Sequence, residues 1–160
     1  MAAVACRWSQ PADLPILYRI DQTIWTSENT PVPATDLTLT EYATRYPAGS
    51  QLVAEIAGQV VGMISWNPQP ALPAWRYTWE IGIGVALTAQ HQGVGQSLMS
   101  ALKQTAKRAG IHRISLRVLG TNQAARQFYA QQGFQVEGVL RDAFWLNGHF
   151  VDDYQLAYLV

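Results

Sequence analysis

The segment from Glu80 to Met99, EIGIGVALTAQHQGVGQSLM, holds the residues whose types and spacing point most directly to chemistry. A strand pattern ends at Leu87 and a helical pattern begins near Val94, with Gly93 and Gly95 at the start of the helix. The unpaired N–H groups and the positive dipole end of a helix start suit a phosphate or pyrophosphate group. The spacing therefore predicts an anion site at this helix start.

The composition of the same segment indicates how the anion would be held. Residues 86–96 include no Lys or Arg and only one histidine, His91, so the ligand would depend on backbone N–H donors, which glycine lets approach closely. Two other phosphate-binding patterns do not fit. No glycine in the chain is followed by lysine, which excludes the P-loop, and Gly82 and Gly84 are not followed by the third glycine of the dinucleotide-binding fingerprint.

Metal and disulfide chemistry are not expected from this sequence. His91, His112 and His149 show no metal-ligand spacing, and no CxxC or HExxH motif is present. Cys6 is the single cysteine, so no intrachain disulfide can form. We therefore predict no metal site.

The elements that must position the helix start follow from hydrophobic periodicity and turn residues. In chain order, the patterns predict helices over 14–24 and 38–46, a hairpin over 51–66 turning at Gly58, a proline-dense loop over 67–74, a strand over 76–87, a helix over 94–109, a strand over 112–120, a helix over 122–133, and a last hairpin turning at Asn147 and Gly148. Strands that alternate with helices in the middle of the chain imply a parallel strand pair inside a mixed sheet.

Local signals refine three of these elements. Ser9 and Asp13 are candidate caps of the first helix, and Thr38 with Glu41 matches a capping box for the second. Two glycines, at positions 82 and 84, interrupt the central strand and predict a bulge or a close backbone approach.

Length, composition and charge limit the possible classes of protein. The chain has 160 residues, of which 49% are hydrophobic and 14% charged, which predicts one globular domain over residues 1–160. Eleven Lys and Arg balance eleven Asp and Glu, and Lys103 and Lys107 are the only lysines, so we expect neither a nucleic-acid partner nor a membrane partner. The first eight residues hold too short an apolar run for a signal peptide, and a cytoplasmic location is expected.

The sequence resembles the GNAT superfamily of N-acetyltransferases at two signatures. Gln90 to Gly95 fits the family pattern Q/R-x-x-G-x-G/A, and Asn122 precedes a helix that carries Tyr129 and ends before Gly133 and Phe134. The resemblance covers essentially the whole chain. It implies the GNAT fold, an α/β architecture in which a mixed, mostly antiparallel twisted sheet has a central parallel strand pair splayed by a bulge, flanked by about four helices.

A narrower resemblance concerns a subgroup of the family. The segments RYTWE, from Arg76 to Glu80, and NGHFVDDYQLA near the end of the chain resemble the phosphinothricin and methionine sulfoximine acetyltransferases and related amino-acid acyltransferases. This match implies an amino-acid-like acceptor.

The family resemblance implies acetyl-CoA as cofactor. Backbone amides from Gln92 to Ser97 would hold its pyrophosphate, the pantetheine would lie along the preceding strand, and Asn122 would also contact the coenzyme. The implied cofactor-binding residues are Ile83, Val85, Leu87, Gln90, Gln92, Gly93, Val94, Gly95, Gln96, Ser97 and Asn122.

Acetyl transfer to an amine requires the neutral amine. At pH 7, the free energy of deprotonation is small for an α-amine with a pKa of about 8 and much larger for a lysine-like amine with a pKa of about 10.4. Glu80 is the best candidate for the base and matches the subgroup's glutamate, with an exposed strand carboxylate as the alternative. Other family members place a glutamate on the next strand, where this chain has Arg117, so the base is Glu80 or an ordered water.

Tyr129 and the acceptor-binding residues also have alternative interpretations. The resemblance makes Tyr129 the acid that protonates the departing thiolate, while its place in an amphipathic helix is also typical of a core aromatic. Arg76 matches the subgroup's arginine for a substrate carboxylate, or it is a solvated surface residue. Trp25 and Trp75 would line the acceptor pocket, although each of the tryptophans is predicted more readily as a core residue.

Three further alternatives concern the acceptor and the assembly. The acceptor could instead be a protein or peptide α-amine, or the chain could bind acyl-CoA without catalysis. A possible homodimer would use the hydrophobic final strand pair. No GxSxG motif is present, which disfavours a covalent acyl-enzyme against direct transfer.

Overall fold

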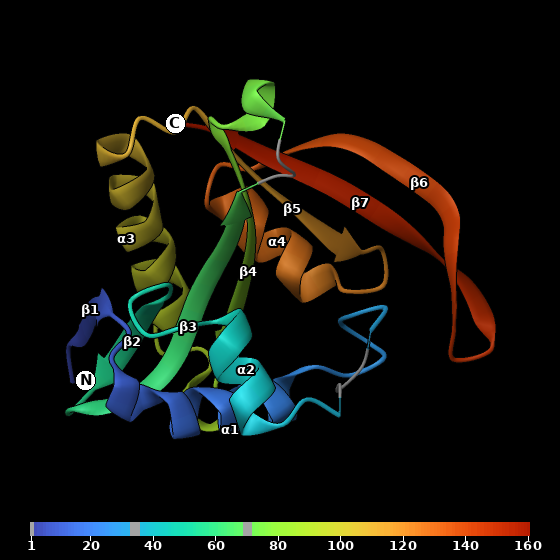
Figure 1. Cartoon of the computed structure of the whole chain (residues 1–160). Coiled ribbons are helices and arrows are strands. Elements are labelled where there is room, and N and C mark those ends of the chain that lie inside the picture. Colours follow the sequence, from blue (N-terminus) through green and yellow to red (C-terminus); the bar gives the residue numbers. More distant parts are fainter. Residues whose placement is uncertain (1, 33–35, 69–71) are drawn as a thin grey trace. The chain divides into compact units, whose positions relative to one another are not determined.

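The computed structural model describes residues 2–32, 36–68 and 72–160. Backbone contacts divide the chain into two compact units whose segments alternate along the sequence. The first unit comprises Met1–Ile24, Ala34–Trp66 and Gly82–Thr105, and the second comprises Trp25–Pro33, Asn67–Ile81 and Ala106–Val160. The helices and strands (Figure 1) are β1 (Val4–Trp8), α1 (Leu14–Ile24), α2 (Leu39–Arg45), β2 (Leu52–Ile56), β3 (Gln59–Pro68), β4 (Thr78–Val85), α3 (Val94–Arg108), β5 (Arg113–Leu119), α4 (Gln123–Gln131), β6 (Gln135–Leu146) and β7 (His149–Leu159).

The strands form one sheet in the order β1-β2-β3-β4-β5-β7-β6. The pairs β1/β2, β2/β3, β5/β7 and β6/β7 are antiparallel, whereas β4 and β5 are parallel. This topology, with four α-helices in the described residues, confirms the predicted mixed α/β fold with an internal parallel pair.

The parallel ladder between β4 and β5 is short. It joins Thr78–Glu80 of β4 to Arg113–Ser115 of β5, and each strand then continues, to Val85 and to Leu119 respectively. Register shifts occur elsewhere, in the pairing of β2 with β3 and of β6 with β7. A bulge in β4 therefore stays a prediction.

Strand β1 was not predicted from the sequence. It pairs antiparallel with β2, from Val4 opposite Ile56 to Trp8 opposite Leu52. Its side chains do not alternate cleanly between buried and exposed, because Cys6 and Arg7 are both only partly exposed. Pairing with β2, rather than local periodicity, makes this segment a strand.

The start of the first helix also differs from the prediction. A short 3₁₀ turn, Pro11–Asp13, precedes α1, and neither candidate cap acts on α1 itself. Ser9 Oγ accepts a hydrogen bond from the Gly49 N–H, and Asp13 Oδ2 accepts one from the Gln10 N–H. The capping box of α2 is confirmed, since the Glu41 N–H donates to Thr38 Oγ1 and the Thr38 N–H donates to Glu41 Oε2.

The proline-dense segment is more regular than predicted. Strand β3 continues through Asn67 and Pro68, and Pro73–Trp75 forms a 3₁₀ turn; residues 69–71 lie outside the described part of the chain, as do residues 33–35 of the loop before α2. No helix among the described residues is both long and apolar enough to cross a membrane. No cluster of three His, Cys, Asp or Glu side chains suited to a metal occurs in that part of the chain either.

Both predicted hairpins are confirmed. The β2–β3 turn places Ala57 and Gly58 at positive φ, and the β6–β7 turn does the same for Asn147 and Gly148, as tight hairpin turns require. Strand β6 is exposed along most of its length, and the large apolar residues exposed on this hairpin are Val136, Val139, Leu140, Trp145, Phe150 and Leu159. A homodimer through this surface stays a prediction.

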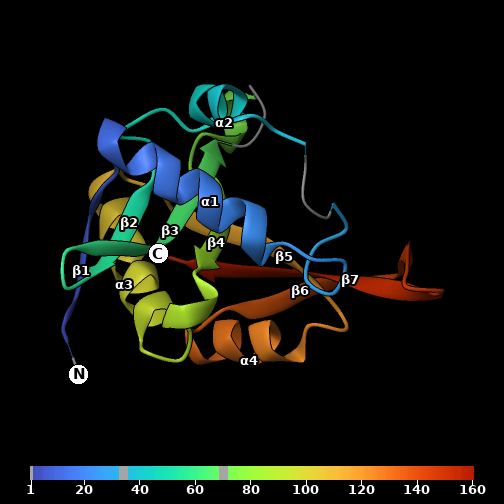
Figure 2. The same ribbon diagram turned by 90° about the horizontal axis from the view of Figure 1, so that it is seen from below.

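In the second unit, α4 lies along one face of β5, β7 and β6 (Figure 2). The β5 side chains alternate, with Ile114, Leu116 and Val118 buried and the residues between them more exposed. The ring of Phe134, just after α4, packs 5.7 Å from that of Tyr158, the register partner of Ile114. The apolar face of this part of the sheet therefore lies under α4, and the alternate residues point to the opposite face.

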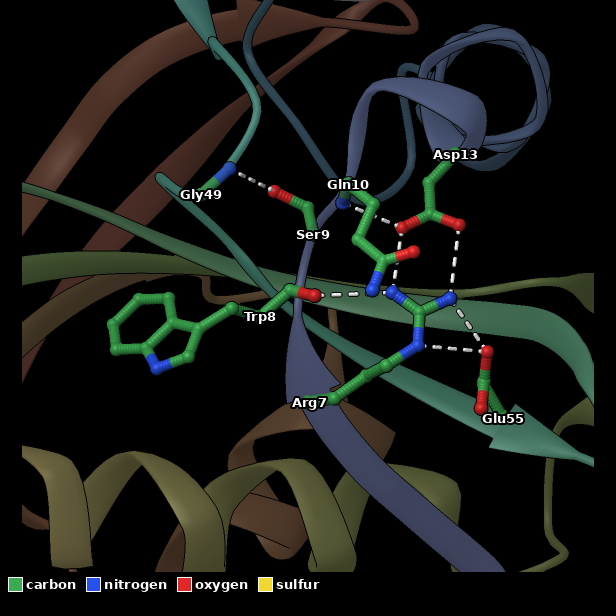
Figure 3. Close-up of polar contacts among 7 residues, drawn as sticks. All are labelled: Arg7, Trp8, Ser9, Gln10, Asp13, Gly49 and Glu55. Atoms are coloured by element: carbon green, nitrogen blue, oxygen red, sulfur yellow. Dashed lines mark hydrogen bonds and ion pairs between the residues drawn. The ribbon is translucent and has the colours of Figure 1, made fainter.

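A cluster of charges joins β1, β2 and the first helical turn in the first unit (Figure 3). The Arg7 guanidinium donates to both Asp13 oxygens, at 2.7 and 2.9 Å, and to Glu55 Oε1 from Nε at 2.9 Å. Asp13 is buried, with 7% of its surface exposed. The cluster therefore ties the strand that the sequence did not predict to the entrance of α1.

We predict that Asp13→Asn lowers the free energy of unfolding by about 1–3 kcal/mol at pH 7. Hydrogen bonds from Arg7 favour the charged form and hold the pKa of the Asp13 carboxyl below its ordinary value. A lowered folded pKa gives stability that is present above the ordinary carboxyl pKa and lost as the pH falls through the folded value. Urea unfolding should show the difference at pH 7 and a smaller one near pH 3. The exposed Glu28→Gln serves as the control, and a difference that does not change with pH contradicts the assignment.

Candidate active site

The start of α3 follows a turn held in left-handed backbone conformation. His91 has a φ of 61° and Gly93 a φ of 80°, a region that L side chains rarely adopt. The Ser97 N–H donates to the Gly93 carbonyl at 3.0 Å, which opens the helical ladder. The N–H groups before Ser97 have no carbonyl one turn earlier within the helix. The structure therefore places backbone donors at this helix start, as the sequence predicted.

Two glutamine side chains brace the turn. Gln90 Nε2 donates to the Val85 carbonyl at 3.4 Å, and Gln92 Nε2 donates to the Thr88 carbonyl at 3.0 Å. These bonds tie the turn to the end of β4 and to the short 3₁₀ turn Leu87–Ala89. Both side chains thus shape the backbone that would contact a ligand, and their direct part in coenzyme binding stays a prediction.

The helix start packs tightly at two glycines. A Cβ on Gly62 would lie 3.0 Å from the Gly84 carbonyl oxygen and 3.0 Å from Val94 Cγ1. A Cβ on Gly84 would overlap Cδ1 of Ile24. A side chain at position 84 would therefore displace the end of the Ile24 side chain within the first unit.

This packing predicts a rescue between two substitutions. Gly84→Ala should lower the free energy of unfolding by about 1–3 kcal/mol through overpacking. Ile24→Val removes the overlapping Cδ1 and alone costs about 0.5–1.5 kcal/mol. In the double variant, the loss of unfolding free energy should be smaller than the sum of the losses in the two single variants. A double-mutant cycle in urea measures this difference. Gly82→Ala is the control, because its Cβ would meet only Ser65 Oγ at 3.9 Å; strictly additive losses would contradict the packing argument.

The residues expected along the pantetheine lie at the end of β4. Ile83 and Val85 are partly buried and lie beyond the part of β4 that is paired with β5. The Ala86 N–H donates to the Val61 carbonyl at 2.8 Å, which fixes the strand end to β3. Leu87 follows in the 3₁₀ turn with 64% of its surface exposed. Their contacts with a coenzyme stay a prediction.

Asn122 has a structural role at the start of α4. Its Oδ1 accepts a hydrogen bond from the Ala125 N–H at 3.2 Å and so caps the helix. Arg126 Nη1 donates to the Gly120 carbonyl at 3.2 Å, and its guanidinium stacks 3.9 Å from the centre of the Tyr154 ring. Side chains at the start of α4 therefore cap the helix and hold the turn before it.

The position of Tyr129 is fixed by the way α4 ends. The Phe134 N–H donates to the Tyr129 carbonyl and the Gly133 N–H to the Ala130 carbonyl, both at 3.0 Å, with Gly133 at a φ of 84°. This is a Schellman motif, and its usual apolar contact is the edge-to-face pair of Tyr129 and Phe134, with ring centres 5.7 Å apart. Burial raises the pKa of Tyr129 above its ordinary value. The phenol therefore keeps its proton at neutral pH.

Glu80 lies in the paired part of β4. It is partly buried and is the register partner of Ser115 on β5. Side chains of register partners leave a sheet on the same face, so Glu80 shares the face of Ser115, opposite to the face of Ile114 that lies under α4. Glu80 is thus placed on the polar face of this strand pair.

The residues predicted to bind the acceptor lie on exposed or partly exposed surface of the second unit. Arg76 Nη1 donates to the Pro73 carbonyl at 2.7 Å, and its guanidinium stacks 4.4 Å from the centre of the Tyr77 ring. Trp75 is 45% exposed and Trp25 is partly buried. The expectation that the tryptophans are core residues is wrong for Trp8, Trp75 and Trp145, which are exposed. Trp25, Trp66 and Trp79 are partly buried.

Comparison with known proteins decides the family. Residues 14–134 match the model of the acetyltransferase (GNAT) family, so the match includes both signatures and the whole region from α1 to the end of α4. This chain belongs to the GNAT acetyltransferase family. The predicted enzyme class, an N-acetyltransferase, is therefore confirmed at the level of the family.

Individual relatives of this GNAT acetyltransferase carry related names. An L-amino acid N-acetyltransferase of Escherichia coli K12 is 32% identical over 112 residues, which cover 69% of this chain and 68% of the relative. An L-methionine sulfoximine/L-methionine sulfone acetyltransferase of Salmonella typhimurium LT2 is 32% identical over 119 residues, covering 74% and 70%. The solved phosphinothricin acetyltransferase of Sinorhizobium meliloti, in complex with acetyl-CoA, has a TM-score of 0.85 at 19% identity, with 98% of this chain and 88% of that chain covered.

Sequence reasoning on this GNAT acetyltransferase missed one pair of residues. Arg117 on β5 donates from Nε to Asp153 Oδ2 on β7 at 2.6 Å, and its Nη2 bonds the same oxygen. From the sequence, the resemblance alone draws attention to position 117, and it predicts no partner for Arg117. Asp153 could not be connected to it from the sequence, because the antiparallel pairing of β5 with β7 joins residues 36 positions apart.

Proposed function

We propose that this chain, acting as one domain over residues 1–160, transfers the acetyl group of acetyl-CoA directly to the primary amine of a small amino-acid-like acceptor. The observation that carries the proposal is the start of α3, where the left-handed turn at Gly93 precedes the first helical hydrogen bond. A helix start of this kind suits a pyrophosphate. Solved GNAT relatives that contain acetyl-CoA support the choice of coenzyme.

The coenzyme would be held mainly by backbone. The amides of Gly93 and of the first residues of α3 would bind the pyrophosphate, with Ser97 at the end of this cradle. Because residues 86–96 include no Lys or Arg, the helix dipole and the N–H groups supply the positive potential. Ile83 and Val85 would pair with the pantetheine, and Asn122 would contact it next to the cap of α4.

Three groups of the chain would carry the chemistry. Glu80 accepts the proton of the acceptor's ammonium, directly or through a water, and frees the nitrogen lone pair. Backbone N–H groups near Val85 polarise the thioester carbonyl as the new C–N bond forms and the C–S bond breaks. Tyr129, whose pKa is raised by burial, gives its proton to the departing thiolate. The second proton of the attacking nitrogen leaves to solvent as the amide forms, and Tyr129 takes a proton back from solvent. The thioester supplies the activated acetyl group, so no covalent acyl-enzyme is needed.

The proposed acceptor class is supported by the names of the relatives and by the residue types predicted to bind the acceptor. The relatives named above act on L-amino acids and on methionine sulfoximine and methionine sulfone. Both kinds of acceptor carry a primary amine beside a carboxylate. Arg76, Trp25 and Trp75 are proposed to contribute to acceptor binding.

A CoA-release assay tests the proposal. Free amino acids, methionine sulfoximine, polyamines and a peptide with a free N-terminus are offered with acetyl-CoA, and binding of acetyl-CoA alone is measured by calorimetry. We expect binding of the coenzyme and the fastest release with an amino acid or methionine sulfoximine. Release that is fastest with the peptide would replace the acceptor class. Binding without release from any amine would favour a non-catalytic acyl-CoA module, and the absence of binding would overturn the proposal.

A further inference from the structure

The polar face of β4, β5 and β7 brings charged side chains into neighbouring rows. Glu80 is the register partner of Ser115, and Arg117 lies two residues further along β5, so all three side chains leave the same face of the sheet. The parallel ladder of β4 with β5 ends at Glu80 and Ser115, so from the spacing and rise of paired strands Arg117 lies at least about 8 Å from Glu80, within reach of long side chains. Glu80 and Arg117 therefore present opposite charges at neighbouring positions.

Asp153 holds the Arg117 guanidinium in place. Asp153 is 2% exposed, and its Oδ2 accepts hydrogen bonds from both Nε and Nη2 of Arg117. A buried carboxylate with such a partner is a rigid anchor, because moving the arginine away would leave an uncompensated charge. The Arg117 guanidinium is therefore already held in one orientation by Asp153 before any ligand binds.

The Arg117 side chain has capacity for a further anion. Two of the five N–H groups of its guanidinium bond Asp153, and 49% of the side chain is exposed. The edge formed by the two terminal nitrogens matches the two oxygens of a carboxylate. Buried on one side and exposed on the other, this arginine has the form of a carboxylate anchor rather than of a surface ion pair.

The other arginines near the proposed acceptor are less suited to this task. Arg113 lies on the same face but forms a bidentate pair with Glu137 of β6. Arg76 lies in the turn before β4, bonded to the Pro73 carbonyl and stacked on Tyr77. Arg113 also lies two positions from Ser115, the partner of Glu80, but Glu137 already occupies its guanidinium, and Arg76 lies outside β4 and β5.

We propose that Arg117, positioned by Asp153, binds the carboxylate of an α-amino acid acceptor whose amine is deprotonated at Glu80. This inference rests on the proposed function and narrows its acceptor class to amines that carry a carboxylate. The ammonium of such a zwitterion faces the Glu80 carboxylate and its carboxylate faces the guanidinium. Arg117 is then a residue that determines specificity for the carboxylate of the acceptor.

The test compares an acid with its amide. Kinetics are measured with L-methionine sulfone and with its carboxamide, which keeps the amine and side chain but lacks the negative charge. In the variant Arg117→Gln/Asp153→Asn, which removes both charges together, kcat/KM for the acid relative to the amide should fall roughly 10- to 100-fold. The fall should come from the KM of the acid, with the KM of acetyl-CoA unchanged. Taking the ratio to the wild type cancels the different pKa values of the two amines.

Three further variants distinguish binding from structure. Arg117→Lys keeps the positive charge but loses the paired N–H donors of the guanidinium, so it should lose part of the preference for the acid. If the double variant does not melt cooperatively, this variant tests whether Arg117 binds the carboxylate. Asp153→Asn alone should raise the KM of the acid more than that of the amide. Arg108→Gln, at an exposed position in the last turn of α3, is the matched control and should leave the ratio near the wild-type value.

The possible contrary results are distinct. Equal losses for acid and amide in the Arg117 variants overturn the carboxylate assignment, as does a loss of acid preference in Arg76→Gln alone. If the wild type releases CoA with neither compound nor with any other amine, the proposed function fails instead. If the wild type releases CoA with amines while Arg117→Lys and the double variant keep the wild-type ratio of acid to amide, the proposed function stands, and Arg117 does not bind the carboxylate.

Discussion

Replacing Glu80 by glutamine should lower kcat/KM for the amine acceptor about 10-fold at pH 7, because only about a tenth of an α-amine with a pKa of about 8 is neutral there. The substitution keeps the size of the side chain and its place opposite Ser115. At pH 7 an α-amine with a pKa of about 8 is mostly protonated, so the variant must wait for the small neutral fraction. As the pH rises toward 9 that fraction grows, and the difference between variant and wild type should narrow.

The measurement is the pH profile of kcat/KM from pH 6 to 9 for both proteins. The KM of acetyl-CoA and the melting temperature report on folding and on coenzyme binding, and both should be unchanged in the variant. Ser115→Ala, on the register partner, controls for disturbance of the strand pair. Parallel profiles with equal rates would remove Glu80 as the base and leave an ordered water in that role.

The parts of the fold that were predicted correctly have strong local signals. The helix starting at Val94 shows helical periodicity with Lys107 and Arg108 in its last turn, and the hairpin at Asn147 and Gly148 has the residue types that its positive φ values demand. Strand β1 has no comparable signal, because Arg7 and Cys6 interrupt any alternation and its partner lies about fifty residues away. Its ion cluster with Asp13 and Glu55 is likewise a product of tertiary pairing.

The candidate site divides in the same way. The helix start with Gly93 could be predicted because a turn, its glycine and the following helix are contiguous in the sequence. The packing of Gly84 against Ile24 and the bond between Arg117 and Asp153 could not, because each joins residues that meet only after the strands have paired. Tyr129 lies between these cases: its helix and the Gly133 stop are local, whereas the burial that raises its pKa is not.

Replacing Tyr129 by phenylalanine should lower kcat about 10- to 100-fold and leave the KM of acetyl-CoA within about twofold. The change removes only the hydroxyl, so the ring contacts with Phe128 and Phe134 and the Schellman motif at Gly133 remain. Without a proton donor, the thiolate must leave unprotonated or draw a proton from water. Because burial raises the pKa of Tyr129, wild-type kcat should show no loss from its ionisation between pH 6 and 9.

Steady-state kinetics and calorimetry of acetyl-CoA together check this assignment. Tyr158→Phe is the matched control, since Tyr158 belongs to the same aromatic cluster through Phe134 and has no proposed chemical role. A kcat that falls equally in both variants would show that the cluster matters for packing alone. A weaker affinity for acetyl-CoA with unchanged kcat would make Tyr129 a binding residue. Only a loss confined to kcat and to Tyr129→Phe fits a proton given to the leaving thiolate, because that proton is needed after the coenzyme has bound.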